Sequence, residues 1–283
     1  MHRPYGADCA SPSTVSISAN VRSCPYATAH PVTPTARTHD MTERTEKIET
    51  PDGAMEVFIA HPDGQGPFPV IIQIMDALGM REELRDHARR SAQWGYYVLA
   101  PDVFHHFGLK GPMDLADPAT MKQVRAAMTA LTDDLAVQDI EETLKLAEND
   151  KAAREGQIGL YGFCMGGRLT LMLCQALGDR VAAAASIHPG GLATDAPSSP
   201  HRHLDQVTAR LYFGIADQDQ TATPAQMAEL EQALNAHHVV YQLEWHPGAH
   251  HGYMMPSRKN IYHEAAAEKV WGRMQDLFAQ TLG

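Results

Sequence analysis

A cysteine in the middle of the chain lies in a pattern that suits a nucleophile. Cys164 follows a short apolar run, and Gly162 and Gly166 lie two residues before and after it. A strand that turns sharply into a helix leaves no room for neighbouring Cβ atoms, which gives both glycines a steric reason. Such a turn would hold the thiol above a sheet and point the N–H of Met165 at an oxyanion beside the sulfur. The helix N-terminus would also favour the thiolate, so we predict that Cys164 attacks a carbonyl carbon.

The competing interpretation is that Cys164 is a small buried hydrophobe, as most free cysteines are. Cys174 offers an internal comparison, because it lies in a continuous apolar segment of helical period and is assigned to packing. The strand and the helix expected on either side of Cys164 favour the nucleophile there.

A nucleophile in this kind of turn is followed along the chain by an acid and then by a histidine. Asp217 and Asp219 come after an apolar run that ends at Phe213, where a carboxylate at the end of a strand could face an imidazole. His250 and His251 come after the next such run, and adjacent histidines cannot both point the same way. An ordinary Asp-rich turn would also explain the acids, so the residues alone leave these choices open.

Three spaced motifs together resemble the dienelactone hydrolase family of α/β-hydrolases. They are the segments 162–167 (Gly-Phe-Cys-Met-Gly-Gly), 214–217 (Gly-Ile-Ala-Asp) and 247–251 (Pro-Gly-Ala-His-His). Segment 95–104 is similar to the family's Gly-Tyr strand followed by Pro-Asp. The resemblance covers residues 41–283, and its register implies Asp217 as the acid and His251 as the base.

This resemblance implies a triad that cleaves esters or lactones through a thioester acyl-enzyme, without metal or cofactor. Cys164 would attack as a thiolate, His251 would carry the proton to the leaving alkoxide, and Asp217 would hold the imidazole in the useful tautomer. The second oxyanion donor would be the N–H of Ala77. A glutamate of the family in this loop helps to generate the thiolate, and the matching residue here is Asp76, the candidate for thiol activation.

The substrate pocket departs from the family pattern. The family holds its substrate carboxylate with arginines at two places where this chain has His106 and Met255. Arg81, Arg258 and Lys259 are nearby cations that could substitute for them, and several apolar residues would suit a more apolar pocket. The candidate pocket residues are Met80, Arg81, Phe104, His106, Tyr253 and Met255.

Two other functions stay open on the same fold. One is a carboxylesterase or thioesterase for apolar acyl groups. The other is a non-catalytic binding protein in which Cys164 serves as an oxidisable sensor. Turnover of a panel of esters would discriminate the enzymes from the sensor.

Apolar runs of strand length alternate with segments of helical period, which is typical of βαβ units around a mostly parallel sheet. We therefore predict an α/β fold with helices on both faces of a central sheet, as in the α/β-hydrolases. The expected strands are 55–60, 70–75, 96–100, 157–161, 182–187, 209–213 and 239–244. The expected helices are 82–93, 137–147, 224–234 and 267–278, with a loop at 105–117.

The composition narrows the class of partner. The chain has 283 residues, of which 44% are hydrophobic and 20% charged, which indicates a folded globule. Its formal net charge of −11 disfavours nucleic acid and anionic lipid. No run of about 18 apolar residues occurs, so no membrane span is expected. A small-molecule ester or lactone is the expected partner, and the protein is expected to be a monomer or a homodimer.

The first 40 residues differ from the rest of the chain. They are rich in Ser, Thr, Pro and Ala and lack periodic apolar positions, so we predict a disordered extension, with Met41 as a plausible true start and residues 41–283 as the folded domain. Cys9, Cys24, Cys164 and Cys174 are too scattered for a disulfide framework. A reducing compartment, the cytoplasm, is therefore expected.

Two histidine pairs, His105-His106 and His201-Arg-His203, could suggest a metal site. Neither has the i, i+4 spacing on a helix or the carboxylate context of a zinc enzyme. Both are expected to be surface histidines, and no metal is expected.

Overall fold

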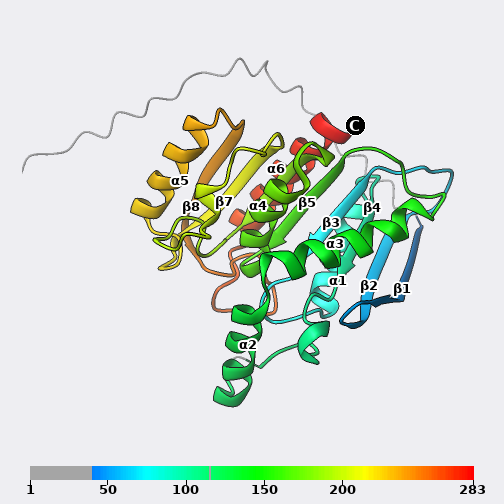
Figure 1. Cartoon of the computed structure of the whole chain (residues 1–283), viewed down its shortest axis with the longest axis horizontal. Helices are drawn as coiled ribbons and strands as arrows, with labels where there is room; N and C mark the ends of the chain where they lie inside the picture. Colours follow the sequence, from blue (N-terminus) through cyan, green and yellow to red (C-terminus); the bar gives the residue numbers. More distant parts are fainter. Residues whose placement is uncertain (1–39, 115) are drawn as a thin grey trace, which may run out of the picture. The chain divides into compact units, whose positions relative to one another are not determined.

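The strands pair into one mixed sheet that is mostly parallel (Figure 1). The computed structural model describes residues 40–114 and 116–283, in which the sheet has eight strands in the order β1-β2-β4-β3-β5-β6-β7-β8. The pairs β1/β2 and β2/β4 are antiparallel, and the pairs that lead from β4 to β8 are parallel. The strands are β1 (Met41–Thr50), β2 (Gly53–Pro62), β3 (Val70–Ile74), β4 (Tyr97–Pro101), β5 (Ile158–Phe163), β6 (Val181–Ile187), β7 (Arg210–Gln218) and β8 (Tyr241–His250).

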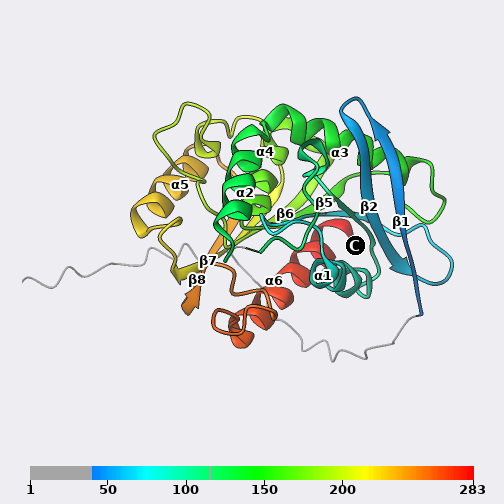
Figure 2. The ribbon, with the colours of Figure 1, turned by 90° about the horizontal axis from the view of Figure 1, so that it is seen from below.

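Helices cover both faces of this sheet, as the sequence predicts. Figure 2 shows α3 and α4 on one face and α1 and α6 on the other. Every residue of β5 is buried, because both of its faces are covered, and this explains its continuous apolar run. The helices are α1 (Glu82–Ala92), α2 (Pro118–Ala130), α3 (Asp133–Glu148), α4 (Met165–Leu177), α5 (Pro224–Ala236) and α6 (Glu264–Leu282), with short 3₁₀ helices η1 (His105–Phe107), η2 (Gly178–Arg180) and η3 (Pro200–Arg202).

One strand and one α-helix were not predicted from the sequence. The edge strand β1 consists mostly of Thr and charged residues and has no buried residue, so it lacks the apolar pattern that marks the other strands. Helix α2 follows the predicted loop. Asp117 caps it by accepting hydrogen bonds from the N–H groups of Ala119 and Thr120, and Pro118 is its first residue. This Asp-Pro start is a helix signal that the sequence did contain.

The parallel strands place four polar side chains at one edge of the sheet. Cys164, His188, Asp219 and His251 are the first residues after β5, β6, β7 and β8, respectively. Because the carboxyl ends of parallel strands share an edge, this topology gathers residues that are far apart in the sequence. The later β-strands are longer than predicted, since β7 continues to Gln218 and β8 to His250.

The prediction of a disordered extension falls on residues 1–39, which lie outside the described residues, as do Cys9 and Cys24. Among the helices that the structure describes, none has both the length and the apolar character needed to cross a membrane.

Candidate active site

Cys164 lies in a strained turn between β5 and α4. Its φ of 54° and ψ of −115° are rare for a residue with a side chain. The Cys164 N–H donates to the carbonyl of Ile187 at 3.0 Å, which ties the turn to β6. A Cβ on Gly162 would collide with the backbone of Gly166, and one on Gly166 would collide with the backbone of Ile74. The steric reason predicted for the two glycines is thus confirmed.

The acid that contacts His251 is Asp219. Nδ1 of His251 lies 2.6 Å from Oδ2 of Asp219, whose side chain is only 1% exposed. The assignment of Asp217 as the partner is wrong, because Asp217 is a solvent-exposed residue of β7, which continues to Gln218 before the chain turns. Asp219 is the first residue past that strand. Thr221 fixes its carboxylate, since the N–H and the hydroxyl of Thr221 donate to Oδ1 at 2.8 and 2.7 Å.

The imidazole of His251 stands between the carboxylate and the thiol. Burial lowers its pKa, but hydrogen bonds to Asp219 and to Cys164 outweigh burial and raise the pKa of His251 to about 10. Burial raises the pKa of Asp219, but the hydrogen bond and the charge of His251 bring that pKa below its ordinary value. The interactions of His251 with the carboxylate and with the thiol therefore favour the protonated form of its ring.

His188 is a further residue of this site that sequence reasoning missed. Its φ is 36°, its side chain is fully buried, and its ring centroid lies 5.2 Å from that of His251. Neither ring nitrogen has a hydrogen-bond partner among the described residues. Burial, together with the charge of His251, holds the pKa of His188 well below its ordinary value, so its ring is neutral. No signal beyond its place after an apolar run could have identified it.

A cavity of about 680 Å³ opens beside Cys164 and His251. Met128, Leu131 and Leu169 form an apolar part of its wall. Arg168 lies on the polar part, where its Nη1 is 3.1 Å from Oδ1 of Asp133. The further lining residues are Thr129, Thr132, Asp134, Met165, Gly190, Gly191, Ser198 and Thr221.

The predicted pocket residues lie outside this cavity lining. Phe104, Tyr253 and Met255 are packed in the core, with at most 1% of each exposed. Arg81 and His106 are engaged by carboxylates, and Met80 packs against the core while partly exposed. The physical reason is the unpredicted helix α2, because its last turn and the start of α3 form the cavity wall instead.

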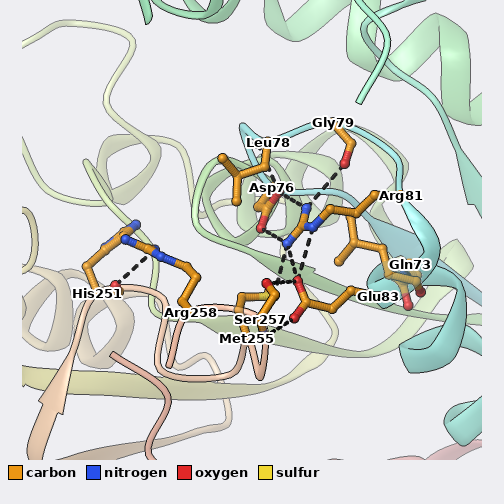
Figure 3. A network of polar contacts seen from close by, with 11 residues as sticks. Gln73, Asp76, Leu78, Gly79, Arg81, Glu83, His251, Met255, Ser257 and Arg258 are labelled. Atoms are coloured by element: carbon orange, nitrogen blue, oxygen red, sulfur yellow. Dashed lines mark hydrogen bonds and ion pairs between the residues drawn. The ribbon is translucent and has the colours of Figure 1, made fainter. Parts of the chain in front are cut away.

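Asp76 is paired with a cation rather than with the thiol. Figure 3 shows Arg81 holding both oxygens of Asp76, at 2.7 and 2.9 Å, and the N–H of Leu78 donates to Oδ1. Arg81 also binds Glu83 at 2.8 Å. A bidentate arginine thus occupies the carboxylate of Asp76 in this structure, and the role of Asp76 in thiol activation stays a prediction. Ala77 is the next residue after Asp76, and its role as an oxyanion donor stays a prediction.

Arg258 donates a hydrogen bond to the backbone of the loop that carries His251. Its Nη1 donates to the carbonyl of His251 at 3.3 Å, and Figure 3 shows both residues beside the Asp76 and Arg81 network. A Cβ on Gly252 would collide with this guanidinium, and Gly252 also has a φ of 91°. The small residue after His251 thus lets the arginine reach the backbone of the loop.

Three of the histidines expected on the surface have side chains with little exposure instead. The side chains of His105 and His106 are 4% and 5% exposed, and both contact Asp139. His201 is also buried, and its Nδ1 is 2.9 Å from the hydroxyl of Ser199. Only His203 is exposed as predicted.

Comparison with known proteins agrees with this architecture. The model of the dienelactone hydrolase family matches residues 55–282. A Synechocystis protein provisionally named carboxymethylenebutenolidase is 27% identical over 244 residues, which cover 84% of this chain and 98% of that protein. A Salmonella typhi protein with the same provisional name is 29% identical over 252 residues, with coverages of 82% and 90%. A Klebsiella pneumoniae structure, provisionally a dienelactone hydrolase, has a TM-score of 0.76 at 24% identity and covers 85% of this chain and 99% of its own.

Proposed function

The chain belongs to the dienelactone hydrolase family of carboxylic ester hydrolases, and we propose that it cleaves small-molecule esters or lactones with a triad of Cys164, His251 and Asp219. The observation that carries this proposal is the imidazole of His251, which Asp219 holds at 2.6 Å and which lines the same cavity as Cys164. The family supports the substrate class, and the arrangement of these three side chains supports the mechanism.

In the first step the Cys164 thiolate attacks the carbonyl carbon and forms a C–S bond. The carbonyl oxygen becomes an oxyanion, which would accept hydrogen bonds from the N–H groups of Met165 and Ala77. Collapse of this intermediate breaks the C–O bond. His251 gives its proton to the leaving alkoxide, and a thioester remains on the sulfur.

In the second step water attacks the thioester. The thiolate has been consumed by then, so one of the two groups that raise the pKa of His251 is gone. Its pKa falls, and the imidazole becomes able to accept the proton of the attacking water. The second intermediate releases the acid product and restores the thiolate and the imidazolium. Asp219 keeps Nδ1 protonated throughout, so that Nε2 is the atom that exchanges the proton.

The cavity also supports a carboxylesterase or thioesterase for apolar acyl groups. Met128, Leu131 and Leu169 offer an apolar wall, while Arg168 could contact an anionic group. A panel of p-nitrophenyl acetate, p-nitrophenyl hexanoate, acyl thioesters and anionic lactones would rank these substrate classes by kcat/KM.

The decisive test is the loss of turnover in Cys164→Ala, measured with p-nitrophenyl acetate. We expect activity to fall to background and the wild-type chain to accumulate an acyl adduct on Cys164, detectable by mass spectrometry after rapid acid quenching. Cys174→Ala is the matched control, because Cys174 is buried in α4 and burial raises its pKa. Full activity of Cys164→Ala would refute the proposed nucleophile, and no turnover by the wild-type chain on any ester would favour a sensor.

A further inference from the structure

A carboxylate inside the fold gathers two adjacent imidazoles away from the proposed triad. Asp139 on α3 is fully buried, and His105 and His106 of η1 bring their rings to it. Nε2 of His105 lies 3.0 Å from Oδ1 of Asp139, and Nε2 of His106 lies 3.0 Å from Oδ2. The two rings lie against each other, with centroids 3.8 Å apart. Both Nε2 atoms thus face the same carboxylate.

This carboxylate lacks the cation that a buried charge needs. Among the described residues, no lysine or arginine forms an ion pair with Asp139, and its side-chain partners are the two histidines. A buried carboxylate is stable when it is paired with a positive charge or binds a metal ion. A neutral imidazole supplies a hydrogen bond but no charge. One positive charge, either an added proton or a bound cation, would therefore stabilise the buried carboxylate of Asp139.

The geometry suits a metal ion. One donor atom from each of His105, His106 and Asp139 can be chosen so that all three lie within 4.8 Å of one another. Two ligands at about 2.1 Å from one metal are separated by roughly 3.0–3.4 Å at ordinary coordination angles. Each histidine nitrogen lies 3.0 Å from one oxygen of Asp139, Oδ1 for His105 and Oδ2 for His106, and a separation of this size falls in that range. Imidazole and carboxylate together are ligands that zinc accepts.

A second carboxylate supports His106 from its other side. Oδ2 of Asp52, in the turn between β1 and β2, lies 3.8 Å from Nδ1 of His106. Histidines that bind a metal commonly direct their second ring nitrogen to such a carboxylate. The Asp52 side chain is 46% exposed, so solvent reaches the residue that contacts His106. Nδ1 of His105 has no hydrogen-bond partner among the described residues, so the ring of His105 is held less firmly than that of His106.

We propose that His105, His106 and Asp139 bind a divalent transition metal, preferentially zinc, with a water as the fourth ligand. The metal would join η1, which follows β4, to α3, whose first residue Asp133 lines the cavity. The site lies outside the triad and takes no part in the proposed reaction. Its test is therefore independent of the proposed hydrolase function.

The experiment measures zinc bound to the full chain. Cys164→Ala serves as the parent, because the thiol and imidazole of the triad could themselves bind zinc. The chain is dialysed against EDTA, incubated with zinc sulfate and desalted, and zinc is counted by plasma mass spectrometry. We expect one equivalent of zinc to be lost on adding His106→Gln. We also expect zinc at a hundredfold excess over Kd to raise the Tm of the parent by roughly 5 °C.

His237→Gln is the matched control. His237 and Asp205 form an exposed pair at 3.2 Å without a third ligand, so this variant should keep the equivalent that His106→Gln loses. Equal zinc content in the parent and in His106→Gln, or no zinc in the parent, would overturn the proposal.

Cobalt provides a readout that does not depend on the stability of His106→Gln. Co²⁺ added to the parent should give visible d–d absorption typical of nitrogen and oxygen ligands, and zinc should displace it. A featureless spectrum of the parent would count against the site even if His106→Gln fails to fold.

Discussion

Nδ1 of His251 and Oδ2 of Asp219 are 2.6 Å apart, and each residue is the first after its strand. The two strands, β7 and β8, are parallel neighbours, so their carboxyl ends hold the imidazole and the carboxylate side by side. Thr221 occupies the other oxygen of Asp219. The carboxylate is thus oriented by the fold before any substrate arrives, which is the condition for it to fix the tautomer of His251.

The first prediction separates the two neighbouring acids. Asp219→Asn should lower kcat/KM for p-nitrophenyl acetate by roughly 10²–10⁴-fold, because the amide favours the wrong tautomer of the imidazole. Asp217→Asn should stay within about twofold of the wild type, because Asp217 is exposed and has no described contact with His251. Steady-state kinetics at pH 7.5 would check both. A larger loss of kcat/KM in Asp217→Asn than in Asp219→Asn would mean that Asp219, which contacts His251 in this structure, is not the catalytic acid.

The sequence predicted the turn at Cys164 but not the acid that contacts His251. The Gly-x-Cys-x-Gly turn was predictable, because its steric demands lie within five neighbouring residues. Asp217 and Asp219 could not be separated by local pattern, because the answer depends on how far β7 continues before the chain turns. The motif register pointed to Asp217. The contacts of Asp219 with Thr221 and His251 are made by residues whose places are set only after folding.

The cavity was missed for a similar reason. Its wall depends on α2 and on the start of α3, which pack over the nucleophile from a segment without strong apolar periodicity. Asp76 was assigned to the thiol by its place in the loop. Arg81, which binds the carboxylate of Asp76, lies only five residues away. The direction of its side chain could not be predicted from the sequence. The parallel sheet, by contrast, was legible from its alternating apolar runs.

The second prediction concerns stability at alkaline pH. Because the pKa of His251 is raised from 6.5 to about 10, the folded chain keeps a proton that the unfolded chain releases in this range. This contribution to stability is complete below pH 6.5 and is lost as the pH rises through about 10. The Tm of the wild type should therefore fall more steeply between pH 7 and 10 than that of His251→Gln. Parallel pH profiles of the two proteins in scanning calorimetry would contradict the raised pKa.

The third prediction tests the close packing under the nucleophile. A Cβ at position 166 would meet the carbonyl oxygens of Ile74 and Met75 at 2.5 Å, and these backbone atoms of the central sheet have little room to move. Gly166→Ala should cost roughly 3 kcal/mol of unfolding free energy, or about 10 °C in Tm. Gly272 on α6 is the control, because nothing lies within 4 Å of its added Cβ. Gly272→Ala should stabilise the chain by about 0.5–1 kcal/mol, since alanine favours a helix.

The fourth prediction concerns the charge of the substrate. Arg168 is on the cavity wall, and Asp133 holds one of its nitrogens at 3.1 Å. Arg168→Gln should lower kcat/KM for an anionic ester by roughly tenfold while leaving a neutral ester of the same size nearly unchanged, because it removes one charge-assisted hydrogen bond. Asp133→Asn should act in the opposite direction, because it frees the guanidinium for the substrate.

Arg180→Gln controls for the loss of a cation at a distance from the site. Arg180 pairs on the surface with Glu141 at 2.6 Å and does not line the cavity beside Cys164. Its replacement should therefore leave the ratio of kcat/KM values for the anionic and the neutral ester unchanged. If Arg168→Gln and Asp133→Asn shift that ratio in the same direction, Arg168 does not bind an anionic group of the substrate. The apolar wall of Met128, Leu131 and Leu169 would then be the feature that selects the substrate.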